Sequence, residues 1–185
     1  MQKETSPRLQ PINKPKSLKL KIAYWFTKRI FGKVFTPLKV HYSRFPEALG
    51  LSGKLVRLDK KFTIDTKLKH MIKAYVATIN GCAFCVDIAK ASAQRHKIKS
   101  NSFDDLLRFE ESELFSEAHK AALAYVDEST RNKRVTDSTF ERLQRYYNER
   151  EIVQITLLNA IENFYNLTNT PLNINSDELC KLMQK

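Results

Sequence analysis

The chain has 185 residues, of which 42% are hydrophobic and 28% charged, with only 4 Gly and 6 Pro. This composition excludes a disordered or collagen-like protein, and the length supports one domain with a sizeable core rather than two. The formal net charge is +12 at pH 7, so the charge balance leaves nucleic acid and anionic lipid open as partners.

Most of the excess charge lies at the N-terminus, where residues 1–46 hold eleven Lys and Arg against Glu4 alone. Residues 1–16 are polar, interrupted by Pro and lack the apolar stretch of a secretory signal, so we expect a flexible basic tail on a cytoplasmic protein. Residues 17–35 alternate Lys with Leu, Ile, Trp and Phe and resemble a surface-lying amphipathic helix. We favour packing of its aromatic residues on the body or on a neighbouring subunit, with membrane or nucleic-acid contact as the alternative.

The rest of the chain reads as a series of helices, without the alternation of a β-strand. Apolar residues at helical spacing predict one helix over 65–79, capped by Asp65 or Thr66. Further helices with cap residues at their starts are predicted over 116–128, 136–147 and 148–167. We therefore predict an all-α protein with a single helical domain over 17–185.

Two of the three cysteines lie three positions apart, in the stretch NGCAFCVDIAKA. Asn80-Gly81 should end the preceding helix, and a new helix should begin at Cys82 or just after it. In this CxxC both sulfurs share one helix face, within reach of a disulfide, and the helix N-terminus favours the thiolate. The pair therefore indicates redox chemistry, while Cys180 is expected to be a plain thiol.

Other uses of a CxxC fit this sequence less well. Zinc needs two further ligands, and the remaining candidates are scattered singly: His41, His70, His96, His119 and Cys180. A thioredoxin fold would place the motif after a strand, whereas the segment before Cys82 has helical spacing. We expect no metal and no cofactor.

The helical frame around the dithiol resembles the core of the alkylhydroperoxidase D-like and carboxymuconolactone decarboxylase family. The flanking segments FTPLKVHYSRFPEAL, SEAHKAALAYVDESTRN and NEREIVQITLLNAIENFYN resemble the family's other helices in order and spacing, so the resemblance covers roughly residues 35–170. It implies an all-α bundle that assembles as a homo-oligomer, a trimer or a hexamer. It also implies a thiol peroxidase or a related reductase that acts on a peroxide or a disulfide and is recycled by a thiol reductant.

By this resemblance Cys85 attacks the peroxide and Cys82 resolves the sulfenic acid. The family's relay glutamate, twelve residues before the first cysteine, falls on His70, and its relay histidine, four after the second, falls on Ala89. We predict that His70 substitutes as the base, because imidazole titrates near neutral pH. Asp87 is expected to be a solvated acid in the first helical turn.

Two other functions stay open. One is a non-catalytic or redox-sensing oligomer whose basic arm contacts an acidic partner, which the changed relay positions favour. The other is a decarboxylase-like enzyme of small molecules on the same scaffold. The most informative single observation would be peroxide-dependent loss of two free thiols, compared between the wild type and Cys82→Ser.

Overall fold

The computed structural model describes residues 6–98 and 103–182, and their regular structure is entirely helical. The elements in chain order are α1 (Leu18–Phe31), η1 (Leu38–Tyr42), α2 (Glu47–Asp59), α3 (Thr66–Ile79), α4 (Ala83–Arg95), η3 (Leu106–Arg108), α5 (Glu117–Asn132), α6 (Asp137–Gln144), α7 (Glu149–Asn169), η4 (Thr170–Leu172) and α8 (Leu179–Leu182). The predicted all-α class is confirmed. None of the helices in these residues is long and apolar enough to cross a membrane.

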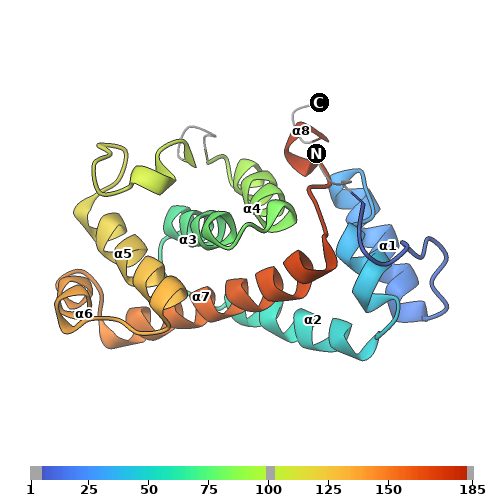
Figure 1. Cartoon of the computed structure of the whole chain (residues 1–185), viewed down its shortest axis with the longest axis horizontal. Coiled ribbons are helices and arrows are strands. Elements are labelled where there is room, and N and C mark those ends of the chain that lie inside the picture. Colours follow the sequence, from blue (N-terminus) through green and yellow to red (C-terminus); the bar gives the residue numbers. More distant parts are fainter. Residues whose placement is uncertain (1–5, 99–102, 183–185) are drawn as a thin grey trace.

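Helix α3 lies at the centre of the bundle, between α4, α5 and α7 (Figure 1). Its apolar residues make up much of the main core together with residues of α5 and α7. Helices α1 and α2 form the other end of the molecule, and the chain after α7 turns back between α1 and α4 to reach α8 (Figure 1). The N-terminal third and the C-terminal segment therefore meet beside the start of α4.

The predicted helix starts are confirmed where a side chain caps the first turn. Asp65 accepts a hydrogen bond from the Leu68 N–H at the start of α3. Ser116 and Thr136 cap α5 and α6 in the same way. Asn148 opens α7 with a reciprocal capping box, because such caps satisfy amides that have no partner within the helix.

Helix α2 was not among the predicted helices. Two glycines, Gly50 and Gly53, lower its intrinsic helix propensity, so the local pattern is weak. Its packing supplies the stability: Leu55 packs on the main core, and Ser52 is buried and accepts a hydrogen bond from the Tyr165 hydroxyl through its carbonyl. Helix α1 is shorter than the predicted 17–35, because Gly32 takes a left-handed conformation with φ 75° after Phe31.

The segment before α1 runs along the body of the protein. The Arg8 N–H donates to the Leu172 carbonyl, and the Ile12 N–H donates to the Lys39 carbonyl, both at 2.9 Å. The Tyr24 hydroxyl also donates to the carbonyl of Ile12. Residues 6–16 of the expected tail are thus held by hydrogen bonds, and residues 1–5 lie outside the described residues.

Candidate active site

The two cysteines lie at the start of α4, where the sequence predicted them. Helix α3 ends at Ile79, Gly81 adopts φ 67°, and Cys82 is the N-cap of α4. Cys82 and Cys85 are joined as a disulfide, with their Cα atoms 5.3 Å apart. The structure therefore describes the oxidised state of the pair, and the glycine provides the turn that brings the sulfurs to a helix N-terminus.

A network of asparagines holds this turn against α7. The side-chain amide of Asn80 donates to the oxygens of both Asn163 and Asn166, each at 2.9 Å. Asn166 in turn donates to the Glu162 carboxylate at 2.8 Å. The residue two before Cys82 is thus fixed by buried polar groups of a single long helix.

The disulfide is buried in an apolar cluster. Cys82 is 1% exposed and Cys85 2% exposed. Their cluster contains Val40 of η1, Phe84 between the two cysteines, and Ile174 and Leu179 of the C-terminal segment. Two surface hollows, one lined by residues 105–112 and one between the starts of α1 and α2, have neither cysteine in their lining.

One polar side chain reaches the disulfide. Asn169, the last residue of α7 and only 3% exposed, donates its Nδ2–H to Cys85 Sγ at 3.4 Å. The same amide places its Oδ1 3.3 Å from Nε2 of His41. Because an amide oxygen only accepts, His41 must carry a proton on Nε2, and its Nδ1 is then the basic nitrogen of the neutral ring.

His41 is held in the neutral form by its surroundings. Burial lowers the pKa of His41 below its ordinary value, and the hydrogen bond with Asn169 opposes this shift. The ring also lies against Tyr42, with 4.1 Å between ring centroids. The contacts from Cys85 through Asn169 to His41 thus form a continuous polar path out of the apolar cluster.

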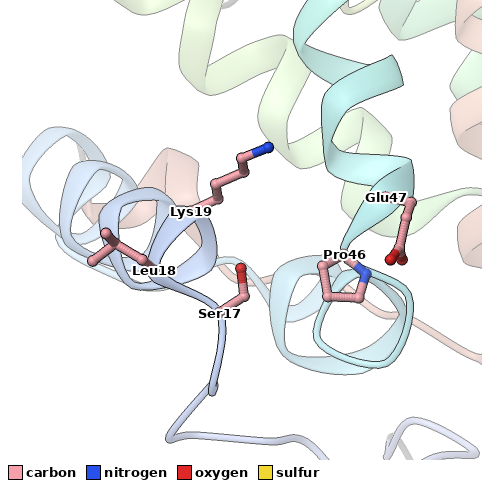
Figure 2. A pocket seen from close by; sticks show the side chains of 5 residues that line it. All are labelled: Ser17, Leu18, Lys19, Pro46 and Glu47. Atoms are coloured by element: carbon pink, nitrogen blue, oxygen red, sulfur yellow. The ribbon is translucent and has the colours of Figure 1, made fainter.

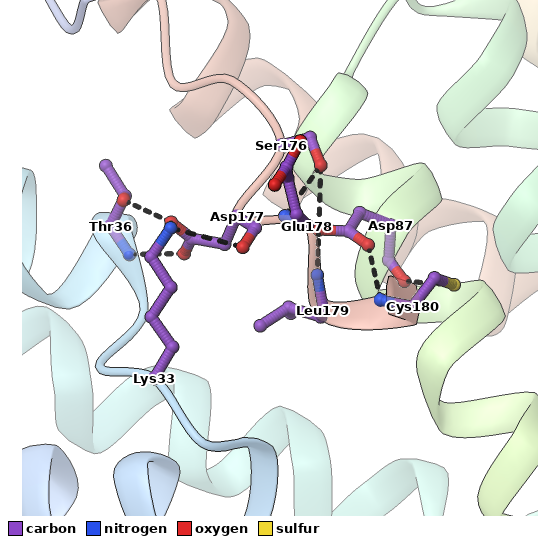
Figure 3. Close-up of polar contacts among 8 residues, drawn as sticks. All are labelled: Lys33, Thr36, Asp87, Ser176, Asp177, Glu178, Leu179 and Cys180. Atoms are coloured by element: carbon purple, nitrogen blue, oxygen red, sulfur yellow. Dashed lines mark hydrogen bonds and ion pairs between the residues drawn. The ribbon is translucent and has the colours of Figure 1, made fainter. Parts of the chain in front are cut away.

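The C-terminal segment packs on the cysteines through Ile174 and Leu179. Asp177 joins this segment to the loop after α1 (Figure 3). The Asp177 carboxylate accepts hydrogen bonds from the Thr36 N–H at 2.7 Å and from the Thr36 hydroxyl at 2.6 Å. It also pairs with the Lys33 ammonium at 3.1 Å. Asp177 is 2% exposed, so this carboxylate is fully committed to joining the C-terminal segment to the loop after α1.

On the other side Asp87 holds the same segment to α4, as Figure 3 shows. Its carboxylate accepts from the N–H groups of Leu179 and Cys180, at 2.9 and 3.0 Å, and from the Ser176 hydroxyl at 2.9 Å. The prediction that Asp87 is a solvated acid is wrong, because the residue is only 8% exposed. The C-terminal chain returns over this position, and its unpaired amides need an acceptor there.

Cys180 lies in the segment that Asp87 holds and is a free thiol, as expected. Its sulfur is 3.6 Å from the backbone oxygen of Asp87. Burial, and then the nearby Asp87 charge, raise the pKa of the Cys180 thiol. This environment opposes formation of the Cys180 thiolate, which is the nucleophilic form of cysteine.

His70, the predicted base, lies on α3 and is buried. Its ring lies beside that of His96 at the end of α4, with 5.1 Å between centroids, so the end of α4 covers this side of α3. Burial lowers the pKa of His70 to about 4, and the charges of Lys73 and His96 act in the same direction. Among the described residues, His70 contacts His96, whereas Cys85 is linked through Asn169 to His41.

Helix α7 carries a further buried acid, Glu162. Burial raises the pKa of Glu162 to about 7, while the hydrogen bond from Asn166 and the charge of Lys73 oppose this rise. Spacing alone could not place Asn169 and His41 beside the dithiol. His41 and Asn169 are 128 positions apart, and only the folded bundle brings them together.

Comparisons with known proteins identify a family and a fold. Residues 51–128 match the model of the carboxymuconolactone decarboxylase family. The uncharacterized protein YnjA of Escherichia coli (strain K12) is 26% identical over 164 residues, which are 87% of this chain and 90% of YnjA.

Two solved structures extend the similarity to the fold. A protein of unknown function from Agrobacterium tumefaciens, suggested to be the antioxidant defence protein AhpD, is 25% identical with a TM-score of 0.70 and covers 74% of this chain and 94% of its own. The debrominase Bmp8 is 21% identical with a TM-score of 0.80 and covers 98% of both chains. The bundle is therefore shared with proteins of different named activities.

Proposed function

Because this chain belongs to the carboxymuconolactone decarboxylase family, with the alkylhydroperoxidase D-like fold, we propose that it is a thiol-dependent peroxidase. Cys82 and Cys85 form its redox pair. The observation that carries the proposal is the hydrogen bond from Asn169 to Cys85 Sγ within an otherwise apolar cluster. A donor aimed at a buried sulfur stabilises the thiolate, which is the reactive form of cysteine.

The reaction uses two electrons from the dithiol. The Cys85 thiolate attacks the terminal oxygen of a hydroperoxide, and the O–O bond breaks. The leaving alkoxide takes back the proton that the thiol gave up, so that an alcohol leaves and Cys85 becomes a sulfenic acid. The Cys82 thiol then attacks this sulfur, which releases water and forms the disulfide that the structure describes. An external dithiol reduces the disulfide by exchange and restores both thiols.

His41 is the proton acceptor that the geometry favours. It lies one hydrogen-bonded residue from Cys85, and its ring is neutral near pH 7 because burial lowers its pKa. Because Nε2 already carries a proton toward Asn169, the proton of the Cys85 thiol reaches the basic Nδ1 of His41 through water, and Asn169 orients the ring. His70 remains the base predicted from the family pattern, and substitution of each histidine distinguishes the two.

The cluster around the sulfurs favours an organic hydroperoxide over hydrogen peroxide. Its walls are Val40, Phe84, Ile174 and Leu179, which offer apolar contact and few hydrogen-bond partners. Both sulfurs are buried, so a substrate reaches them only when the C-terminal segment moves away. We therefore include opening of residues 174–182 in the catalytic cycle.

The near-complete burial of the disulfide also favours a second candidate, a redox-sensing protein that oxidises once and does not turn over. The two are separated by steady-state reduction of cumene hydroperoxide with a dithiol reductant in excess. The peroxidase turns over many times per protein, loses this activity in Cys85→Ser and keeps it in Cys180→Ser. A single stoichiometric oxidation without turnover would overturn the peroxidase and leave the sensor.

We also propose that the protein is a homo-oligomer, with α7 at a subunit interface. The outer side of α7 carries apolar residues at alternating spacings of four and three: Val153, Leu157, Ala160, Phe164 and Leu167. This spacing forms a straight apolar seam, which packs against a like helix. Light scattering should give a mass above that of one 21.5 kDa chain, and Leu157→Glu should lower it.

A further inference from the structure

Helix α1 has two apolar faces. Its inner face packs on the body through Leu20 and Tyr24, which are buried together with Thr27. Its outer face carries large apolar side chains that the described residues leave exposed: Leu18 at 71%, Ile22 at 58%, Trp25 at 66% and Phe26 at 54%. Because a helix turns 100° per residue, these four positions form one stripe opposite the buried face.

Cations border this stripe on both sides. On the helical wheel Lys19 lies along one edge, Lys21 and Lys28 lie along the other, and Arg29 lies within the stripe near its C-terminal end. All four side chains are exposed, and none takes part in an ion pair with another described residue. The positive charge around the outer face of α1 is therefore not neutralised by the fold.

The N-terminal end of the stripe is open to solvent. Ser17, Leu18 and Lys19 line a surface hollow together with Pro46 and Glu47 at the start of α2. Figure 2 shows the Leu18 side chain pointing away from Pro46 and Glu47. Glu47 borders the hollow but forms no ion pair with Lys19 in the described residues, so it does not neutralise the positive charge at this edge of the stripe.

We propose that the outer face of α1 binds the surface of an anionic lipid bilayer, with the helix lying in the plane of the interface. The Trp, Phe, Leu and Ile side chains enter the boundary between headgroups and acyl chains, and the flanking Lys ammonium groups contact lipid phosphates. The strongly basic N-terminal segment, with eleven cations against one acid in residues 1–46, adds attraction at longer range. This proposal does not rest on the redox chemistry.

Charge decides between this partner and a second copy of the chain. A twofold pairing of two α1 helices would bring Lys19, Lys21, Lys28 and Arg29 of each copy toward the same cations of the other. Like charges brought together in this way oppose association. An anionic bilayer surface offers apolar contact to the stripe and negative charge to the cations that border it.

The aliphatic residues of the stripe favour a bilayer over nucleic acid as the partner. Leu18 and Ile22 occupy the stripe beside Trp25, and they have no aromatic face on which a base can stack. Binding to a duplex rests on cations that contact phosphates and gains little from an exposed aliphatic stripe. A bilayer interface takes up aliphatic and aromatic side chains alike.

The full-length protein carries its own reporter, because Trp25 is its single tryptophan. We expect its emission to shift to shorter wavelength when vesicles of phosphatidylcholine with about one-third phosphatidylserine are added. The shift should be absent with pure phosphatidylcholine. It should be reversed in about 1 M NaCl, where the Debye length is about 3 Å.

Matched variants locate the binding face. Ile22→Asp places a charge within the stripe and should weaken vesicle binding at least about 10-fold, whereas Leu107→Asp, the same change at an exposed site on η3, should not. Charge reversal of three lysines at the edges of the stripe should also weaken vesicle binding. Charge reversal of three exposed lysines in α2 and just after it should leave vesicle binding unchanged. The two triple variants, each with the same change in net charge, are Lys19→Glu, Lys21→Glu, Lys28→Glu and Lys54→Glu, Lys60→Glu, Lys61→Glu.

Three results would overturn the proposal. The first is the absence of any shift with the anionic vesicles at low salt. The second is a shift that depends on protein concentration alone, which would indicate a second copy on the stripe. The third is tighter binding to duplex oligonucleotides than to vesicles at equal phosphate, with no effect of Ile22→Asp.

Discussion

The side-chain amide of Asn169, a buried residue at the end of α7, donates to Cys85 Sγ at 3.4 Å. Asn169→Ala should raise the pKa of the Cys85 thiol in the reduced protein and slow its reaction with hydroperoxide about 10- to 100-fold, the usual effect of losing one hydrogen bond to a charged group. The pH dependence of iodoacetamide alkylation measures the thiol pKa. Thr168→Ala is the control, because its hydroxyl bonds only to the Tyr165 carbonyl. An unchanged thiol pKa in Asn169→Ala would show that the contact does not activate Cys85.

The two candidate bases can be compared directly. His41→Ala should lower the peroxidase rate about 100-fold, in the range of a lost general base, and should remove the part of the pH profile that rises through the lowered pKa of His41. His70→Ala should have the same effect only if His70 is the base that the family pattern predicts. Its pKa of about 4 would place that rise at a lower pH than an ordinary histidine gives.

The base is identified by comparing the pH profiles of the peroxidase rate of the two variants, measured on the same substrate. A large loss in His41→Ala with a nearly normal His70→Ala supports the path through Asn169. The reverse result supports the sequence prediction. Two nearly normal profiles would mean that neither histidine takes the thiol proton.

Glu162 should make the stability of the protein depend on pH. Its pKa is about 7 in the folded protein against an ordinary value of 4.5, so the folded state binds the proton more tightly. The stabilisation is fully present below pH 4.5 and is lost as the pH rises through about 7. The total effect is about 3 kcal/mol.

Glu162→Gln keeps the acceptor for Asn166 but cannot ionise. Chemical unfolding should therefore show a variant about as stable as the wild type near pH 4.5 and more stable at pH 8, by up to about 3 kcal/mol. Glu128→Gln, at a site without this burial, should leave the pH dependence unchanged. Equal pH dependence in wild type and Glu162→Gln would mean that Glu162 does not take up this proton.

Release of the C-terminal segment should expose the disulfide. Asp177→Ala removes the acceptor of two hydrogen bonds from Thr36 and the partner of Lys33, so residues 174–182 should open more often. The rate of disulfide reduction by a phosphine should rise about 10-fold or more. Glu178→Ala, at an exposed neighbour that pairs only with Lys181, should reduce at the wild-type rate. Equal reduction rates in both variants would mean that the segment does not limit access.

Local sequence patterns predicted the helix boundaries that place the dithiol. The left-handed turn at Gly81 and the cap at Asp65 depend only on neighbouring residues, and the structure confirms both. Helix α2 was missed because its local propensity is weak and its stability comes from tertiary packing.

The surroundings of the dithiol depended on contacts between distant segments. His41 was considered only as a metal ligand, and Asn169 had no motif that pointed to Cys85. Asp87 has the local pattern of a first-turn acid, but the segment that binds it lies about ninety positions further along the chain. The contacts of a side chain at this site depend on which distant segment packs against it. The spacing of residues in a single sequence does not show that packing.

The central claim is that Cys82 and Cys85 form a reversible redox pair that reduces a hydroperoxide. The most direct test is to count free thiols by mass spectrometry, before and after one equivalent of cumene hydroperoxide is added to the reduced protein. The wild type should go from three free thiols to one, with the Cys82–Cys85 disulfide as the product and Cys180 unmodified. Cys82→Ser should stop at a Cys85 sulfenic acid, because no other cysteine resolves it. Three thiols that persist in the wild type after peroxide has been added would contradict the claim.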